Sequence, residues 1–334
     1  MDAPIASLLP AFKRFQLIYV ALRIGLIARL GVTSGTSAEL AVDLGIPEAR
    51  LLRLLRGLLW AEILKFEDAG RYRLSDDARA LLDDSPTSLA AGILFQGRFF
   101  YAAWGHLLDY VRDGAVPFEI AHGKSLFDLI GDDPSLSADF NAPMAKRTEE
   151  YSLAVSELPV LKGARVIVDV AGGEGRLLAD LLTANPSARG IVFDLASIAG
   201  QSLRLIKELG LSDRCRFQPG DMFAEVPPGG DVYLLKWVLH DWNDERVLRI
   251  LTNVRRAMTK DARVVIIERL MPDPVVVGHP LIQADLNMLV LNGGAERTRL
   301  QYELLLAQAD LSSHEVTPVE SNYGFYAIIA KTSK

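Results

Sequence analysis

Residues 166–175, with the sequence VIVDVAGGEG, decide the fold. The first half is an apolar run typical of a buried strand, the second half is a glycine-rich turn, and residues 176–182 then open a helix. Glycines let a backbone pass close to a ligand, and a helix N-terminus offers free N–H groups. Taken alone, this pattern fits either a dinucleotide fingerprint or an ordinary tight turn.

Acidic residues after the next two apolar strands narrow the choice of ligand. Asp194 ends the second strand, where a carboxylate is placed to bind ribose hydroxyls. Asp221 and Met222 follow the third strand and form a polar–apolar pair suited to an adenine. No cluster of Arg or Lys lies at the glycine turn to neutralise a pyrophosphate. The pattern therefore favours a nucleoside over a dinucleotide.

Strands alternate with helices from about residue 163 onward. The expected strands are residues 165–169, 190–194, 214–217, 231–236 and 263–268, with a final pair at 313–319 and 323–331. This alternation predicts an α/β fold with a doubly wound, mostly parallel, Rossmann-like sheet.

The first hundred residues show helical periodicity instead. Thr36 and Glu39 form a capping box, and residues 48–60 place five leucines on one broad face. Residues 63–66 and 71–74 read as a small hairpin. Together they indicate a mostly helical, winged-helix-like domain.

The arginines of the second helix raise the possibility of DNA binding. Arg50, Arg53 and Arg56 lie along it, but they equally suit a solvated or partner-facing surface. The formal net charge of −6 argues against a nucleic-acid partner, and we favour the surface interpretation.

The composition of the chain excludes further classes of protein. Half of the 334 residues are hydrophobic, ample for two domains, and Cys215 is the single cysteine. One cysteine excludes an internal disulfide or a cysteine-built metal site and fits a reducing cytoplasm. We find no secretory signal pattern and no apolar run of membrane-spanning length. We therefore expect a cytoplasmic protein that binds neither nucleic acid nor a membrane.

Several segments in a fixed order resemble a known family. They are residues 169–175, 193–195, 220–223, 235–242 and 292–298. In this order they resemble the S-adenosylmethionine-dependent small-molecule O-methyltransferases, which include caffeic acid and acetylserotonin methyltransferases and bacterial antibiotic-tailoring relatives. The resemblance covers nearly the whole chain. It departs from the family at Ala171, where the glycine run usually begins with Gly.

The resemblance implies an arrangement of domains and a cofactor site. Residues 1–105 would form a dimerisation domain, residues 106–160 a helical connector at the substrate pocket, and residues 161–334 the cofactor domain. The protein would be a homodimer. S-adenosylmethionine would be the methyl donor and S-adenosylhomocysteine the product, with no metal. The implied cofactor contacts are Gly172, Gly173, Gly175, Asp194, Asp221, Met222, Lys236 and Trp237.

The chemistry calls for a base. A phenol has a pKa of about 10, so little phenolate exists at neutral pH, and a neutral imidazole is suited to take the proton. His240 follows an apolar strand, at the edge of the sheet where ligands bind in open α/β folds. In the family the matching histidine is the catalytic base. The glutamates that match Glu268 and Glu296 flank it and hold its ring.

Acceptor-binding residues are less clearly marked. Trp104, Phe140 and Met144 lie in helical segments and suit either helix packing or the roof of a flat aromatic pocket. Asn287 and Met288 match a family segment that lines the pocket, although plain packing explains them equally well.

The leading hypothesis is an O-methyltransferase acting on a small aromatic natural product. One alternative is an N-methyltransferase acting on a nitrogen heterocycle such as a phenazine. A second is a non-methylating hydroxylase or decarboxylase relative, and a third is a winged-helix regulator with a degenerate enzyme domain. His240, Glu268 and Glu296 together favour O-methylation, because a nitrogen lone pair needs no base.

Overall fold

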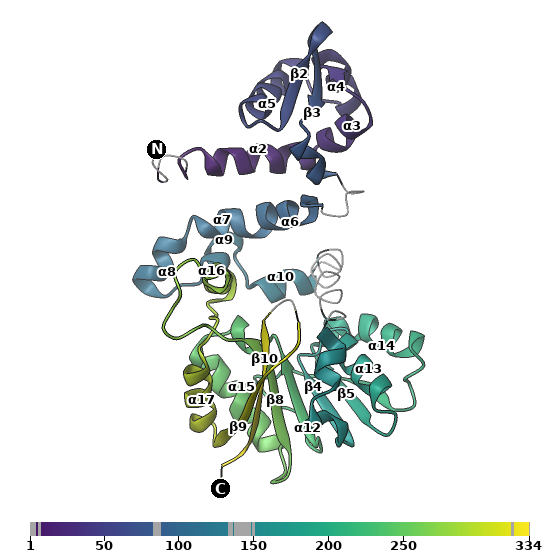
Figure 1. The fold of residues 1–334 in the computed structure, drawn as a ribbon, viewed down its shortest axis with the longest axis vertical. Coiled ribbons are helices and arrows are strands. Elements are labelled where there is room, and N and C mark those ends of the chain that lie inside the picture. Colours follow the sequence, from purple (N-terminus) through teal and green to yellow (C-terminus); the bar gives the residue numbers. More distant parts are fainter. Residues whose placement is uncertain are drawn as a thin grey trace. The chain divides into compact units, whose positions relative to one another are not determined.

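The computed structural model describes residue 5 and residues 8–82, 88–132, 136, 148, 151–321 and 324–333. The chain divides into two compact units, Met1–Gly105 and His106–Lys334. Figure 1 labels the elements of each.

The first unit is mainly helical. Its helices are α2 (Ala11–Arg23), α3 (Leu26–Val32), α4 (Ser37–Leu44), α5 (Glu48–Trp60), α6 (Ala90–Phe95) and α7 (Tyr101–Trp104). A three-stranded antiparallel sheet joins β1 (Gly35–Thr36), β3 (Arg71–Leu74) and β2 (Leu64–Glu67), in that order.

Local sequence signals explain the helix boundaries of this unit. The predicted capping box is present: Thr36 accepts from the N–H of Glu39, whose carboxylate accepts from the N–H of Thr36. Leu51, Leu55 and Leu58 of α5 are buried in the core of this unit. Among the described residues, no single helix is long and apolar enough to cross a membrane. Within the part of the chain that the structure describes, one pair of helices, α2 and α3, passes a test of length and composition together, but the two are bent by 70° relative to each other.

The second unit is built on a seven-stranded sheet of order β6-β5-β4-β7-β8-β10-β9. The strands are β4 (Val166–Val170), β5 (Arg189–Asp194), β6 (Cys215–Pro219), β7 (Val232–Lys236), β8 (Arg263–Arg269), β9 (Leu311–Pro318) and β10 (Phe325–Thr332). The first five are parallel, and β10 pairs antiparallel with β8 and β9. The chain order reverses between β4 and β7, and open α/β sheets bind ligands beside such a point.

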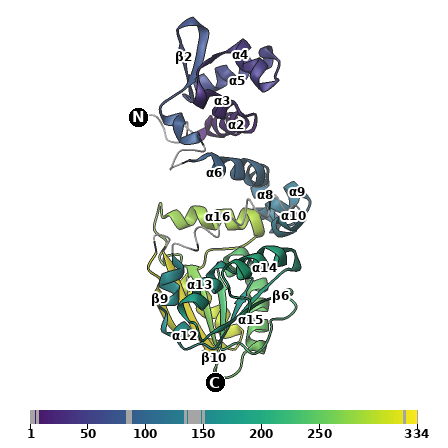
Figure 2. The same ribbon diagram turned by 90° about the vertical axis from the view of Figure 1, so that its right-hand side faces the viewer.

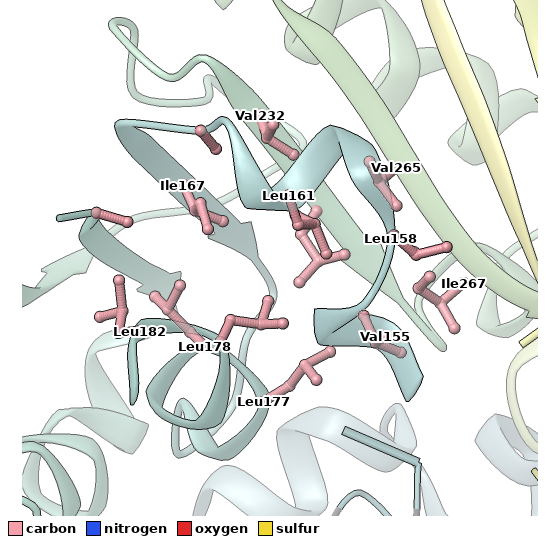
Figure 3. Packing of buried hydrophobic residues seen from close by; sticks show 14 of the residues in the cluster. Val155, Leu158, Leu161, Ile167, Leu177, Leu178, Leu182, Val232, Val265 and Ile267 are labelled. Atoms are coloured by element: carbon pink, nitrogen blue, oxygen red, sulfur yellow. The ribbon is translucent and has the colours of Figure 1, made fainter. Parts of the chain in front are cut away.

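Helices cover both faces of this sheet. They are α12 (Pro159–Lys162), α13 (Arg176–Ala184) and α14 (Ala199–Glu208) on one face and α15 (Asp244–Ala257) and α17 (Arg299–Gln308) on the other (Figure 1). The strands are buried on both faces because alternate residues point to opposite sides. Ile167 and Val232 belong to the same buried cluster as Leu177, Leu178 and Leu182 of α13, and Figure 3 shows this cluster.

The described residues of this unit form further helices. They are α8 (Leu107–Asp113), α9 (Pro117–His122), α10 (Leu126–Asp132) and α16 (Pro280–Asn292). Helix α16 lies across one end of the sheet (Figure 2) and contacts the short turn η5 (Leu239–Asp241) that follows β7. The predicted fold class is confirmed, and each expected strand overlaps an observed one.

Candidate active site

The glycine turn after β4 brings backbone to the ligand edge of the sheet. Gly175 precedes α13 with a φ of +83°, and a Cβ there would lie 2.6 Å from Val192 Cγ2. Only glycine fits both the conformation and the space. Ala171, where the family usually has Gly, also has a left-handed φ of +55°. That conformation costs an alanine about 1–2 kcal/mol, so this departure from the family pattern introduces backbone strain.

Asp194 ends β5 beside the same turn. Its carboxylate accepts from the N–H of Gly173 at 2.7 Å and from that of Leu195 at 2.6 Å. Burial raises the pKa of Asp194, and the two N–H donors oppose that shift. Each oxygen keeps a second lone pair, so the carboxylate retains capacity for ribose hydroxyls.

The adenine candidates follow β6. Asp221 is exposed, and its Oδ1 accepts from the N–H of Phe223 at 2.9 Å. Met222 is half-buried, and Asn253 donates to its carbonyl at 2.9 Å. Carboxylates beside a glycine turn fit a nucleoside such as that of S-adenosylmethionine.

Asp169 of β4 and Lys236 of β7 influence each other electrostatically across the sheet. Asp169 is buried at the end of β4, and desolvation raises its pKa to about 7, although the charge of Lys236 opposes the shift. Lys236 donates to Thr148 Oγ1 at 3.2 Å, and its Nζ lies 6.0 Å from the ring centroid of Trp237. Lys236 therefore stands at the switch point with its charge near the cofactor candidates.

The chain turns sharply after β7. Trp237 has a φ of +56°, an unfavourable conformation for a bulky residue. Its N–H donates to Ile267 O at 3.0 Å, and its indole stacks on the His240 imidazole with ring centroids 5.5 Å apart. The turn therefore fixes the direction of His240.

Glu268 of β8 binds the backbone of this turn. Its Oε1 accepts from the N–H groups of Val238, Leu239 and His240 at 3.1, 2.9 and 3.3 Å. The side chain is fully buried, and burial raises its pKa to about 7. The resemblance implies that Glu268 holds the histidine ring, whereas the hydrogen bonds seen here hold the histidine backbone.

Glu296 binds the ring itself. Its Oε1 lies 3.2 Å from His240 Nδ1 and also contacts the guanidinium of Arg269. These two positive partners outweigh burial and lower the pKa of Glu296. On the other side of the ring, Asp241 Oδ1 lies 3.7 Å from Nε2.

The surroundings of His240 favour its protonated form. Burial by itself lowers the pKa of the imidazole, but the charges of Glu268 and Asp241 and the contact with Glu296 outweigh it and raise that pKa to about 9. The site can therefore hold a proton on the histidine.

Arg297 fixes the two loops that carry His240 and Glu296. Its buried guanidinium donates to the carbonyls of Leu239 at 2.9 Å and Trp242 at 2.7 Å, and to Asp244 at 2.8 Å. Gly294 also brings the loops together, because a Cβ there would lie 2.1 Å from the His240 carbonyl oxygen. Arg297 lies in the 292–298 motif, but the sequence alone does not predict that its side chain holds the two loops together.

Helix α16 adds two contacts that the sequence analysis did not predict. Asp285 Oδ1 accepts from the N–H of Glu296 at 2.8 Å, and Asn292 donates to Asp241 Oδ1 at 3.1 Å. Met288 shares their helix face by spacing, and Asn287 and Met288 are both half-buried.

The remaining acceptor-pocket candidates are not brought to this site by the described contacts. Trp104 ends α7 in the first unit. Phe140 and Met144 lie outside the described residues.

Side-chain atoms of His240, Glu268 and Glu296 lie within 4.8 Å of one another, a spacing that suits a metal ion as well. Glu296 already pairs with His240 Nδ1 and with Arg269. We therefore interpret the group as a proton-handling cluster.

Known proteins share this fold and these motifs. The model of the O-methyltransferase domain family matches residues 104–312. O-demethylpuromycin-O-methyltransferase of Streptomyces alboniger is 35% identical over 93% of this chain and 84% of its own length. Phenazine-1-carboxylate N-methyltransferase of Pseudomonas aeruginosa is 31% identical over 91% of this chain and 90% of its own length.

A solved structure is also similar. It is an O-methyltransferase from neocarzinostatin biosynthesis, in complex with S-adenosylmethionine and 2-hydroxy-5-methyl naphthoic acid. It is 28% identical, covers 95% of each chain, and has a TM-score of 0.81.

Fold, site and comparisons define an S-adenosylmethionine-dependent methyltransferase. The chain belongs to the O-methyltransferase family.

Proposed function

We propose that the protein transfers a methyl group to a hydroxyl of a small aromatic secondary metabolite, with His240 as the general base. The observation that carries this proposal is the pairing of His240 Nδ1 with the buried Glu296, beside the switch point of the sheet. A carboxylate behind an imidazole fixes its orientation and stabilises the imidazolium that forms.

The cofactor supplies an electrophilic methyl group on a sulfonium, so that an O–CH₃ bond forms while the S–CH₃ bond breaks and its electron pair stays on sulfur. In our proposal Gly172, Gly173 and Gly175 border the methionine portion, and Asp194 binds the ribose. Asp221 and Met222 bracket the adenine, and Lys236 and Trp237 lie beside the cofactor. Glu268 and Glu296 complete the catalytic group around His240.

The acceptor pocket is proposed to include Trp104, Phe140, Met144, Asn287 and Met288. We also propose a cytoplasmic homodimer assembled through residues 1–105, whose helices and hairpin fit a winged helix. Residues 106–160 would act as connector and 161–334 as the cofactor domain. Exposed apolar residues at the N-terminus, Ile5, Leu8, Leu9 and Phe12, support an interface there.

A panel assay tests the function. The protein is incubated with methyl-labelled S-adenosylmethionine and matched phenols and nitrogen heterocycles. Label on phenolic oxygen supports the proposal. Label on ring nitrogen alone favours the N-methyl alternative, which a relative of similar identity exemplifies. S-adenosylmethionine binding without any transfer favours a non-methylating relative.

A further inference from the structure

The two ring nitrogens of His240 have different surroundings. Nδ1 lies 3.2 Å from Oε1 of Glu296, whose lowered pKa keeps it an acceptor, so Nδ1 carries the hydrogen of the neutral ring. The lone pair of the neutral ring is therefore on Nε2, which is the nitrogen that can take the acceptor's proton. Asp241 Oδ1 lies 3.7 Å from Nε2, about 0.5 Å beyond the usual range of an N–H···O hydrogen bond.

Asn292, the last residue of α16, binds the same oxygen of Asp241. Its amide donates to Oδ1 at 3.1 Å. Within the part of the chain that the structure describes, no other group donates a hydrogen bond to this carboxylate. Helix α16 therefore sets the direction of the side chain that lies next to Nε2.

The backbones on both sides of this contact are held in place. Helix α16 ends at Gly293, whose φ of +68° is the left-handed conformation of a helix cap. A Cβ at Gly294 would lie 2.6 Å from the carbonyl carbon of Asp241. The N–H of Ala295 donates to the carbonyl of His240 at 2.9 Å. The carboxylate of Asp241 can therefore approach Nε2 only by rotation of its own side chain.

Other charged and titratable groups surround the imidazole. They come from β7, β8, α16, α17 and the loop before α17, and they are Lys236, Glu268, Arg269, Asp285, Arg297 and Tyr302. Among the described acidic residues, only Asp241 lies within ion-pair distance of Nε2. Burial opposes protonation of His240, but the carboxylates around the ring outweigh it and raise the pKa of His240 to about 9. Stronger pairing at Nε2 would make the neutral, basic ring scarcer still.

We propose that Asn292 is a positioning residue that holds the Asp241 carboxylate out of hydrogen-bond reach of His240 Nε2, which keeps this nitrogen open for the acceptor's hydroxyl. The inference rests on the proposed function, in which His240 is the general base. Nε2 takes the hydroxyl proton while the O–CH₃ bond forms and the electron pair of the S–CH₃ bond stays on sulfur. The imidazolium then releases the proton to solvent. Without the amide of Asn292, Asp241 turns to accept from Nε2–H, and the base stays protonated.

The amide is removed in Asn292→Leu, which has nearly the same shape, or in Asn292→Ala if the leucine variant does not fold. The titration of His240 is followed by NMR of ¹³C/¹⁵N-histidine-labelled protein loaded with S-adenosylhomocysteine. Its signal, one of five, is identified by its loss in His240→Gln or by single replacement of the other histidines. Wild type should titrate near 9 and Asn292→Leu about one pH unit higher, because a hydrogen-bonded carboxylate stabilises the imidazolium. An unchanged or lower midpoint overturns the proposal.

A second pair of variants tests whether Asn292 acts through Asp241. In Asp241→Asn the carboxylate is absent, so adding Asn292→Leu should cause no further rise in the His240 midpoint. An equal rise in this background would mean that Asn292 acts on the ring by another route, which overturns the proposal. Gln283→Ala changes an exposed residue of the same helix and should titrate as wild type.

The pH dependence of kcat/KM gives the functional readout. With a phenol that is methylated in the panel assay, Asn292→Leu should be about tenfold slower than wild type at pH 7. The difference should shrink as the pH rises above 9, because the neutral ring then becomes the major form. A loss that is the same at every pH indicates a merely structural role and overturns the proposal. If no phenol is methylated, the proposed function fails, while the NMR midpoint still decides the role of Asn292.

Discussion

Glu268 binds His240 through the histidine's backbone, with Oε1 accepting the His240 N–H at 3.3 Å, while Glu296 binds the ring. The two glutamates therefore contact different parts of His240 and have different roles. One holds the strained turn that begins at Trp237, and the other sets the orientation and charge of the imidazole. This division predicts different consequences for their removal.

Replacing Glu268 with Ala should destabilise the protein by at least about 3 kcal/mol, because it leaves three buried N–H groups without an acceptor. Glu268→Gln keeps an acceptor oxygen and should cost less. Urea unfolding measures both, with the exposed Glu225→Ala as control. Equal losses for Ala and Gln would mean that the charge, rather than the hydrogen bonds, stabilises the turn.

Asp194→Ala should weaken S-adenosylhomocysteine binding at least about tenfold. Hydrogen bonds to a charged acceptor contribute roughly 1.5–3 kcal/mol. Calorimetry measures the Kd, and the exposed Asp213→Ala serves as the matched control. Unchanged affinity in the Asp194 variant would remove this residue from the cofactor site.

The N-terminal apolar surface predicts a dimer at micromolar concentration. Leu9 and Phe12 are 72% and 54% exposed, so Leu9→Asp with Phe12→Asp should give a monomer by light scattering. Val277→Asp, which changes a 97% exposed valine in the second unit, should leave the dimer intact. A monomeric, fully active wild-type protein would contradict this interface.

Chelation should not change turnover, because the proposed mechanism uses the His240, Glu268 and Glu296 cluster for proton handling. Activity is compared before and after EDTA treatment and after added Mg²⁺ or Zn²⁺. Loss of activity with EDTA, restored by one metal, would reassign the cluster as a metal site.

The sheet was predictable because its signals are local. Apolar strands, the glycine turn and the Thr36 capping box each depend on a few neighbouring residues, and all appear where the sequence indicates them. The catalytic group depends instead on loops that are distant in the chain. The resemblance named His240 and Glu296, but only folding reveals that Arg297 and Asn292 fix their loops, or that Glu268 binds backbone. A single buried arginine belongs to no periodic pattern, so the sequence does not predict which groups it binds.

The most direct test of the account is the turnover of a phenol by His240→Gln. Glutamine keeps size and polarity but cannot hold the proton, so S-adenosylhomocysteine affinity should be nearly unchanged, while kcat should fall by about 10²–10⁴ at pH 7. Raising the pH toward the phenol's own pKa should restore part of the loss, and His314→Gln on the exposed side of β9 should behave as wild type. Normal turnover by His240→Gln at pH 7 would contradict the account.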